Sequence, residues 1–132
     1  MRYLITAALM VPSLAMSDTL GEQSGLTINT INATDFEVIE TQSMGAADFW
    51  CAAASYNEAR QGRSDLIALY VRSPRGPAKT AQGYKGVVFT TDPAGLPPPI
   101  ASLTLSVDQP GATLKSRKGR SFCRDAFTRS TK

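Results

Sequence analysis

The chain has 132 residues, the size of a single domain, with 14 basic and 11 acidic side chains. It contains no histidine, which excludes Ser-His-Asp and Cys-His nucleophilic sites and all histidine acid–base catalysis. Zinc sites need about four ligands, and the chain has only two cysteines, so no metal site is predicted. Neither glycine-rich phosphate-binding motif is present, so no nucleotide cofactor is predicted.

The first 15 residues have the order of a secretory signal peptide. Arg2 gives a positive start, residues 3–11 are apolar, and Ser13 and Ala15 are the small residues of a cleavage site. This apolar run is shorter than the roughly 20 residues that span a bilayer. We therefore expect cleavage after residue 15, or alternatively after residue 17, and a periplasmic or secreted mature chain. A buried N-terminal helix is the other interpretation.

Residues 16–25 are polar and contain two glycines, which predicts a flexible leader. Residues 26–31 and 36–41 are predicted strands, and the turn residues between them favour a hairpin.

The strongest helix prediction covers residues 45–61, which are rich in Ala, Glu and Arg and are followed by Gly62. Ser43 is the predicted N-cap. One face of this helix should pack on the sheet as core, and it carries Phe49, Trp50, Ala53 and Tyr56. The neighbouring flank carries Ala47, Cys51 and Ala54, and the C-terminal segment, tied through Cys123, should cover it. Asp48, Ser55 and Ala59 face the other way.

Three further strands are predicted over 66–71, 84–91 and 100–107, connected by Pro- and Gly-rich loops that are too short for a crossover helix. We expect an antiparallel meander, followed by a tail over 115–127 that ends in a short helix. The predicted fold is one α+β domain over residues 26–127, with residues 128–132 as a C-terminal tail. One main helix packs on an antiparallel sheet of four to five strands, and a disulfide pins the tail.

That disulfide is predicted between Cys51 and Cys123, because an isolated cysteine pair in an oxidising compartment is expected to oxidise. It closes a loop of about 72 residues, which gives a ceiling near ~4 kcal/mol of stabilisation. The alternatives are a redox pair, which usually has a C-x-x-C spacing that is absent here, or metal ligands.

Charge is distributed unevenly along the chain: residues 18–65 hold eight acids and two bases, and residues 66–132 hold three acids and eleven bases. Arg and Lys beside flexible glycines can bind phosphate or sulfate oxygens, so the second half is a candidate anion-binding region. The loop over 73–83 is the predicted binding loop. The alternatives are a solvated basic surface and mutual neutralisation of the two halves. The candidate anion-binding residues form two clusters in the sequence. The first is Arg72, Arg75 and Lys79, and the second is Lys115, Arg117, Lys118 and Arg120.

Two catalytic alternatives do not require histidine. A pair of carboxylates would suffice for glycoside hydrolysis, although the acids are scattered. A Ser–Lys pair could form from Ser116 with Lys115 or Lys118, although neighbours in a basic stretch are weak grounds for an activated lysine.

A second kind of information comes from short motifs and their order. They are the ADFWCAA run over 47–53, the segments 70–71, 76–77, 88–90 and 102–107, and the late Cys123. Together they resemble a group of small exported alphaproteobacterial proteins of unknown function. The resemblance implies a periplasmic setting and pairing of the two cysteines, and it implies no activity or catalytic residue.

The sequence thus favours an exported, non-enzymatic module that binds an anionic envelope component or a protein partner. Candidate partners are anionic lipid, lipopolysaccharide, a polyanionic glycan or an envelope protein. Nucleic acid is not expected, because the bases are not interleaved with aromatic residues and the chain is predicted to be exported. A small hydrolase or lyase using carboxylates or a Ser/Lys pair is the alternative.

Overall fold

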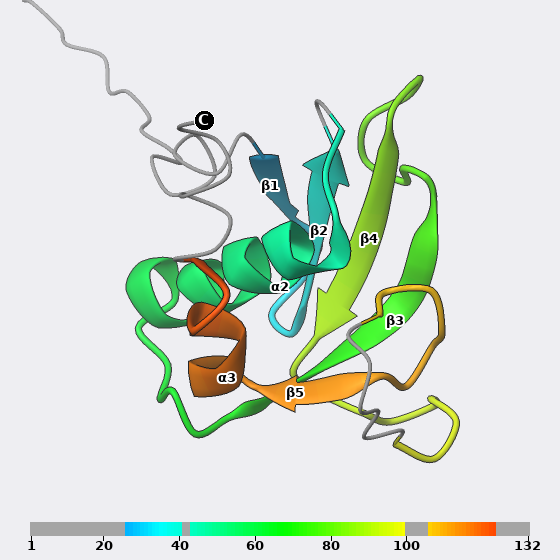
Figure 1. The fold of residues 1–132 in the computed structure, drawn as a ribbon. Helices are drawn as coiled ribbons and strands as arrows, with labels where there is room; N and C mark the ends of the chain where they lie inside the picture. Colours follow the sequence, from blue (N-terminus) through cyan, green and yellow to red (C-terminus); the bar gives the residue numbers. More distant parts are fainter. Residues whose placement is uncertain (1–25, 41–42, 100–105, 124–132) are drawn as a thin grey trace, which may run out of the picture.

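The computed structural model describes residues 26–40, 43–99 and 106–123. Figure 1 shows the elements of this part in chain order: β1 (Leu26–Thr30), β2 (Asp35–Glu40), α2 (Ala46–Ser55), η1 (Tyr56–Arg60), β3 (Ala68–Pro77), β4 (Lys85–Thr90), β5 (Thr113–Lys115) and α3 (Ser116–Arg120). The predicted signal peptide, the leader over 16–25, most of the predicted strand over 100–107 and the tail over 128–132 lie outside the described residues.

The strands form one antiparallel sheet in the order β1-β2-β4-β3-β5, and the main helix crosses one face of it (Figure 1). α2 and η1 together make a continuous helix of 15 residues. The predicted α+β fold, with one main helix on a sheet of four to five strands, is therefore confirmed. Within the described residues, no helix has both the length and the apolar character needed to cross a bilayer.

The helix begins one residue later than predicted and uses a different cap. Gly45 is the N-cap, and the carboxylate of Asp48 accepts a hydrogen bond from the Gly45 amide at 2.9 Å. The prediction of Ser43 as cap is wrong, because an acid three positions into the helix satisfies the amide of the capping residue. At the other end the last turn widens into the π-helix η1. Such turns are rare in proteins, and many of those that occur lie at functional sites.

The core lies between the sheet and the helix face that carries Phe49 and Trp50, both fully buried. Tyr56 stacks on Phe36 of β2 with ring centroids 4.3 Å apart. Trp50 meets Phe89 of β4 edge to face at 5.0 Å, a geometry that aromatic quadrupoles favour. The predicted core role of the helix aromatics is confirmed.

The helix side that faces away from the aromatic residues is largely covered, and the C-terminal segment lies against the cysteine flank as predicted. Asp48 and Ser55 are buried, and only Ala59 of the three residues predicted there is exposed. α3 packs beside α2 and accounts for part of this burial, because Ser55 lies next to the disulfide that follows α3. The helix is thus enclosed on two sides, by the sheet and by the segment around α3.

The predicted meander is wrong in its strand order. The two edges of β4 pair with β3 and with β2, which leaves no edge of β4 for a later strand. Instead, β5 pairs with the first residues of β3. β3 also runs to residue 77, through the first half of the predicted binding loop. It accommodates Pro74 because the pairing with β4 is interrupted by irregularities between Val71 and Gly76, the positions where a strand tolerates proline.

Candidate anion-binding surface

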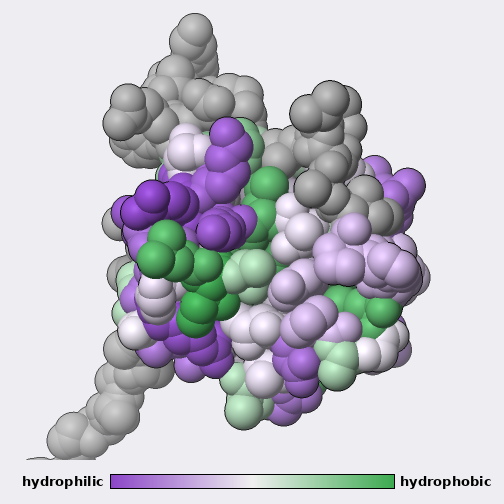
Figure 2. Space-filling model, turned by 90° about the horizontal axis from the view of Figure 1, so that it is seen from below, coloured by the Kyte–Doolittle hydropathy of each residue, from purple (hydrophilic) through white to green (hydrophobic). Residues whose placement is uncertain are grey.

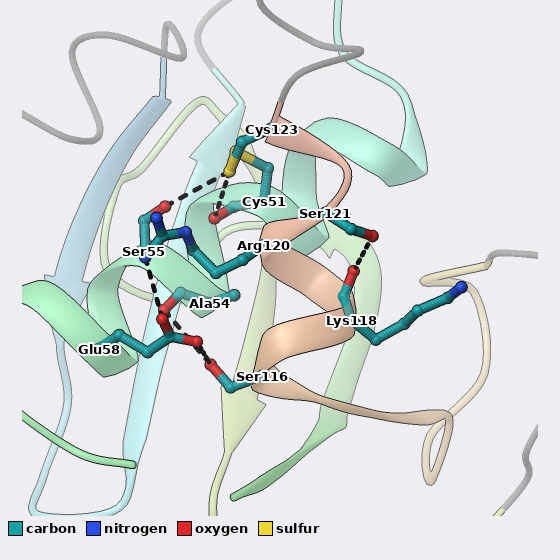
Figure 3. The surroundings of a disulfide bond; sticks show 9 residues. All are labelled: Cys51, Ala54, Ser55, Glu58, Ser116, Lys118, Arg120, Ser121 and Cys123. Carbon is teal, nitrogen blue, oxygen red and sulfur yellow. Dashed lines mark hydrogen bonds and ion pairs between the residues drawn. A yellow bond between two sulfur atoms is a disulfide. The ribbon is translucent and has the colours of Figure 1, made fainter. Parts of the chain in front are cut away.

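The disulfide between Cys51 and Cys123 is present, as predicted, with a Cα–Cα distance of 4.8 Å. It joins the middle of α2 to the residues that follow α3 (Figure 3). The Ser55 hydroxyl lies 3.5 Å from Cys123 Sγ and can donate to it. The covalent link therefore fixes α3, a helix too short to be stable alone, against the longer helix.

Gly119 lets α3 approach α2 closely. A Cβ at this position would lie 3.0 Å from the Trp50 carbonyl oxygen and 3.0 Å from the Ala54 Cβ. Any side chain larger than hydrogen would push the two helices apart. Arg117, Lys118 and Arg120, the charged residues of α3, are exposed.

A polar cluster connects η1 to α3 beside the disulfide (Figure 3). Glu58 accepts a hydrogen bond from the Ser116 hydroxyl at 2.5 Å and pairs with the Arg120 guanidinium at 2.9 Å. Asn57 Nδ2 donates to the same hydroxyl at 3.0 Å. The Ser116 hydroxyl is fully buried, and in the described part of the chain none of its hydrogen-bond partners is a lysine amine. The cluster therefore joins two helices and gives no support to a Ser–Lys catalytic pair.

The four predicted bases of the second cluster lie together at β5 and α3, and we call them the α3 surface: Lys115, Arg117, Lys118 and Arg120. Arg117 has a loose ion pair with Asp65 at 3.4 Å and a side chain that is 63% exposed. The Lys118 ammonium lies 5.8 Å from the centroid of the Phe122 ring. Within residues 26–40, 43–99 and 106–123, neither Lys115 nor Lys118 has a carboxylate partner.

The bases of the first cluster serve the fold. Arg72 lies on β3, where its Nε is 3.2 Å from the Asp35 carboxylate without hydrogen-bond alignment, and its Nη2 donates to the Asp92 carbonyl at 2.8 Å. Arg75 binds Glu40 through two nitrogens, at 3.0 and 2.8 Å from the same oxygen, and also donates to the Met44 carbonyl. These contacts tie β3 to β2 and to the loops at both ends of the sheet.

Lys79 contributes through its backbone. Its amide and that of Thr80 donate to the carboxylate of Glu37 at 2.8 Å each, and the Thr80 hydroxyl adds a bond of 2.6 Å. Glu37 is only 1% exposed, on the sheet face opposite the helix. Gly86 leaves room for it, since a Cβ there would lie 2.9 Å from the carboxylate. The predicted binding loop thus closes over a buried acid of its own chain, and its Lys79 side chain remains exposed.

Sequence reasoning missed Glu37 as a structural residue. An acid that alternates with Phe36 and Val38 along a strand is expected to point to water. Only the return of the loop over that face, which brings three donors to the carboxylate, makes its burial favourable.

The four ion pairs described share one pattern: each joins an acid from the first half of the chain to an arginine from the second half. The acidic first half and the basic second half therefore neutralise one another in part through these ion pairs, as the mutual-neutralisation alternative predicts. Once these pairs are subtracted, four exposed lysines of the described residues remain for an external anion: Lys79, Lys85, Lys115 and Lys118. Of these, Lys115 and Lys118 lie together with Arg117 and Arg120 on the α3 surface.

No protein-family model, no curated protein and no solved structure matches this chain. The resemblance to small exported alphaproteobacterial proteins stays a prediction. The geometry of the described residues is consequently the basis for a functional proposal.

Proposed function

We propose that this protein is an exported, non-enzymatic module that binds an anionic component of the cell envelope through the α3 surface. The single supporting observation is the difference between its bases. Lys115 and Lys118 are exposed and have no carboxylate partner among the described residues, whereas the arginines of β3 are held by acids and carbonyls of the same chain. Export accords with the disulfide, because disulfides persist in oxidising compartments.

Rigidity favours such a role for α3. The helix is fixed by the disulfide, by the close approach at Gly119 and by the bond from Ser116 to Glu58. Cations held on a fixed scaffold lose less conformational entropy on binding than cations on a mobile tail. Arg117 and Arg120 can add their charges at the edge of the site, although each is shared with one carboxylate.

The test measures how strongly the mature protein is retained on immobilised heparin, a sulfated glycan, and how this retention depends on salt. Replacing the two lysines of the α3 surface, Lys115→Ala with Lys118→Ala, should lower the affinity by about 30-fold, taking ~1 kcal/mol for each lysine. The matched control is Lys79→Ala with Lys85→Ala, two exposed lysines of the β3–β4 hairpin that remove the same charge. The control should elute close to the unchanged protein.

Equal shifts for the two double variants would contradict the proposal, because retention would then follow net charge alone. Retention that does not depend on salt would also contradict it and would favour the protein-partner alternative. Circular dichroism of each variant checks that the fold is unchanged.

A further inference from the structure

An apolar side chain stands among the cations of the α3 surface. Leu66 is 55% exposed, one of three large hydrophobic side chains that are exposed among the described residues. The other two are Ile31 in the β1–β2 turn and Tyr84 before β4. Isolated exposed apolar residues are common and do not by themselves indicate a binding site. Leu66 is therefore distinguished by its location.

Backbone pairing places Leu66 beside the lysines and arginines. β3 pairs with β5 so that Ala68 is opposite Lys115. The pairing continues past the strand ends, because the Ser116 amide donates to the Ile67 carbonyl and the Arg117 amide donates to the Asp65 carbonyl, both at 2.8 Å. The segment 65–67 therefore runs alongside the start of α3, with Leu66 between the two residues that accept these bonds.

The surface view agrees with this placement. Figure 2 shows the molecule from below, and on the left, the side on which α3 lies in Figure 1, strongly hydrophilic surface borders a hydrophobic strip. Among the described residues near α3, Leu66 is exposed and Ile67 and Phe122 are half-buried. The Lys118 ammonium lies 5.8 Å from the centroid of the Phe122 ring.

We propose that the anionic component is the headgroup surface of a lipid bilayer, which α3 docks against with Leu66 inserted between the headgroups. This inference rests on the proposed function, since it concerns the same cations. A soluble glycan or phosphate would use the charges alone and would have no use for an apolar side chain in their midst. A bilayer surface rewards both, because interfacial binding adds buried apolar area to electrostatic attraction.

The geometry also limits the strength of docking. Four cations share this surface with the carboxylates of Asp65 and Glu58, and one leucine buries little area. Vesicles of phosphatidylcholine alone should therefore not bind the protein, because even a single acyl chain anchors a protein only marginally. Vesicles that also contain phosphatidylglycerol should bind it reversibly and release it in high salt.

The experiment compares cosedimentation with phosphatidylglycerol-containing vesicles and retention on heparin. Leu66→Ser should weaken vesicle binding about tenfold and leave heparin retention unchanged. The matched control is Tyr84→Ser, which removes an equally exposed hydrophobic residue (53%) from the β3–β4 hairpin. It should alter neither measurement, because the hairpin lies at the upper right of Figure 1 and α3 at the lower left.

Three outcomes separate the possibilities. If Leu66→Ser binds vesicles as well as the unchanged protein does, the bilayer inference is overturned while binding of a soluble polyanion by the α3 surface stands. If Leu66→Ser and Tyr84→Ser weaken vesicle binding equally, insertion at α3 is likewise overturned. If replacing Lys115 and Lys118 changes neither vesicle binding nor heparin retention, the proposed function itself fails.

Discussion

The arginines of β3 and the cations around α3 both come from basic stretches of the second half of the chain, and most of them have different surroundings. Arg75 on β3 makes a bidentate contact with Glu40, a carboxylate whose side chain is 13% exposed, and its guanidinium also lies over the Phe49 ring at 5.5 Å. Arg117 on α3 reaches its acid through a single contact at 3.4 Å.

The difference teaches that a cluster of bases in sequence says little about which of them can bind an external anion. What decides is whether an acid from elsewhere in the chain lies within reach. In the sheet only β4 separates β3 from β2, so the acids of β2 lie within reach of the β3 arginines. In the sequence, β2 ends more than 25 residues before β3 begins. The helix α3 follows the edge strand β5 and packs beside α2 (Figure 1). Arg117 and Arg120 reach acids there, whereas Lys118 has no carboxylate partner among the described residues.

The largest expected effect tests how α3 is held. Replacing Cys51 and Cys123 by alanine should lower the free energy of unfolding by about 3 kcal/mol under oxidising conditions, because the unfolded chain regains the entropy of a long loop. Thermal unfolding followed by circular dichroism should show a Tm lower by roughly 10 °C or more. In reductant the variant and the unchanged protein should melt together. Equal melting in the absence of reductant would contradict a stabilising role.

A smaller effect compares the two clusters directly. Arg75→Gln should cost about 1–2 kcal/mol of folding stability, because Glu40 loses charge-assisted hydrogen bonds in a largely buried position. Arg117→Gln, the matched change on α3, should stay within about 0.5 kcal/mol, as is usual for an exposed ion pair. Urea unfolding of both variants provides the measurement, and equal losses would remove the distinction between the clusters.

The smallest effect concerns the acid that faces Arg72. Burial alone would raise the pKa of Asp35, but hydrogen bonds with Thr90, Thr34 and Asn32 and the Arg72 charge outweigh burial and hold the pKa below its usual value.

A lowered pKa means that the ionised Asp35 favours the folded state. Its contribution is present above the pKa of the unfolded chain and is lost as pH falls through the folded value, that is, below about pH 4. The unchanged protein should therefore be more stable than Asp35→Asn at neutral pH, and the gap should close in acid. A gap that does not change with pH in urea titrations would exclude this linkage.

Local patterns predicted the features that depend on neighbouring residues. The helix, its aromatic core face and the first strand pair follow from periodicity and turn residues, and the disulfide followed from compartment and number. Each of these features can be predicted from the sequence without knowing which strands are neighbours in space. The burial of Asp48 and Ser55 could not be predicted from the helix alone, because it depends on segments that are distant in sequence.

Features that depend on long-range pairing were missed. The prolines at positions 74 and 77 predicted a loop, yet β3 continues through them because this part of the strand has irregular pairing with β4 and no pairing with β5. The separation of the bases into fold-supporting and exposed ones was missed for the same reason. Their acids are 35 or more residues away in sequence. Only the order of the strands brings Arg72 to Asp35.

The buried carboxylate beneath the β3–β4 loop has a consequence for how relatives of this chain could be recognised. The loop is held there by two main-chain amides and one hydroxyl, so most of its side chains can change without loss of the contact. The acid and the glycine that makes space for it cannot change so freely. We expect evolution to preserve a Glu in the second strand with a Gly in the fourth, while the loop between the third and fourth strands drifts.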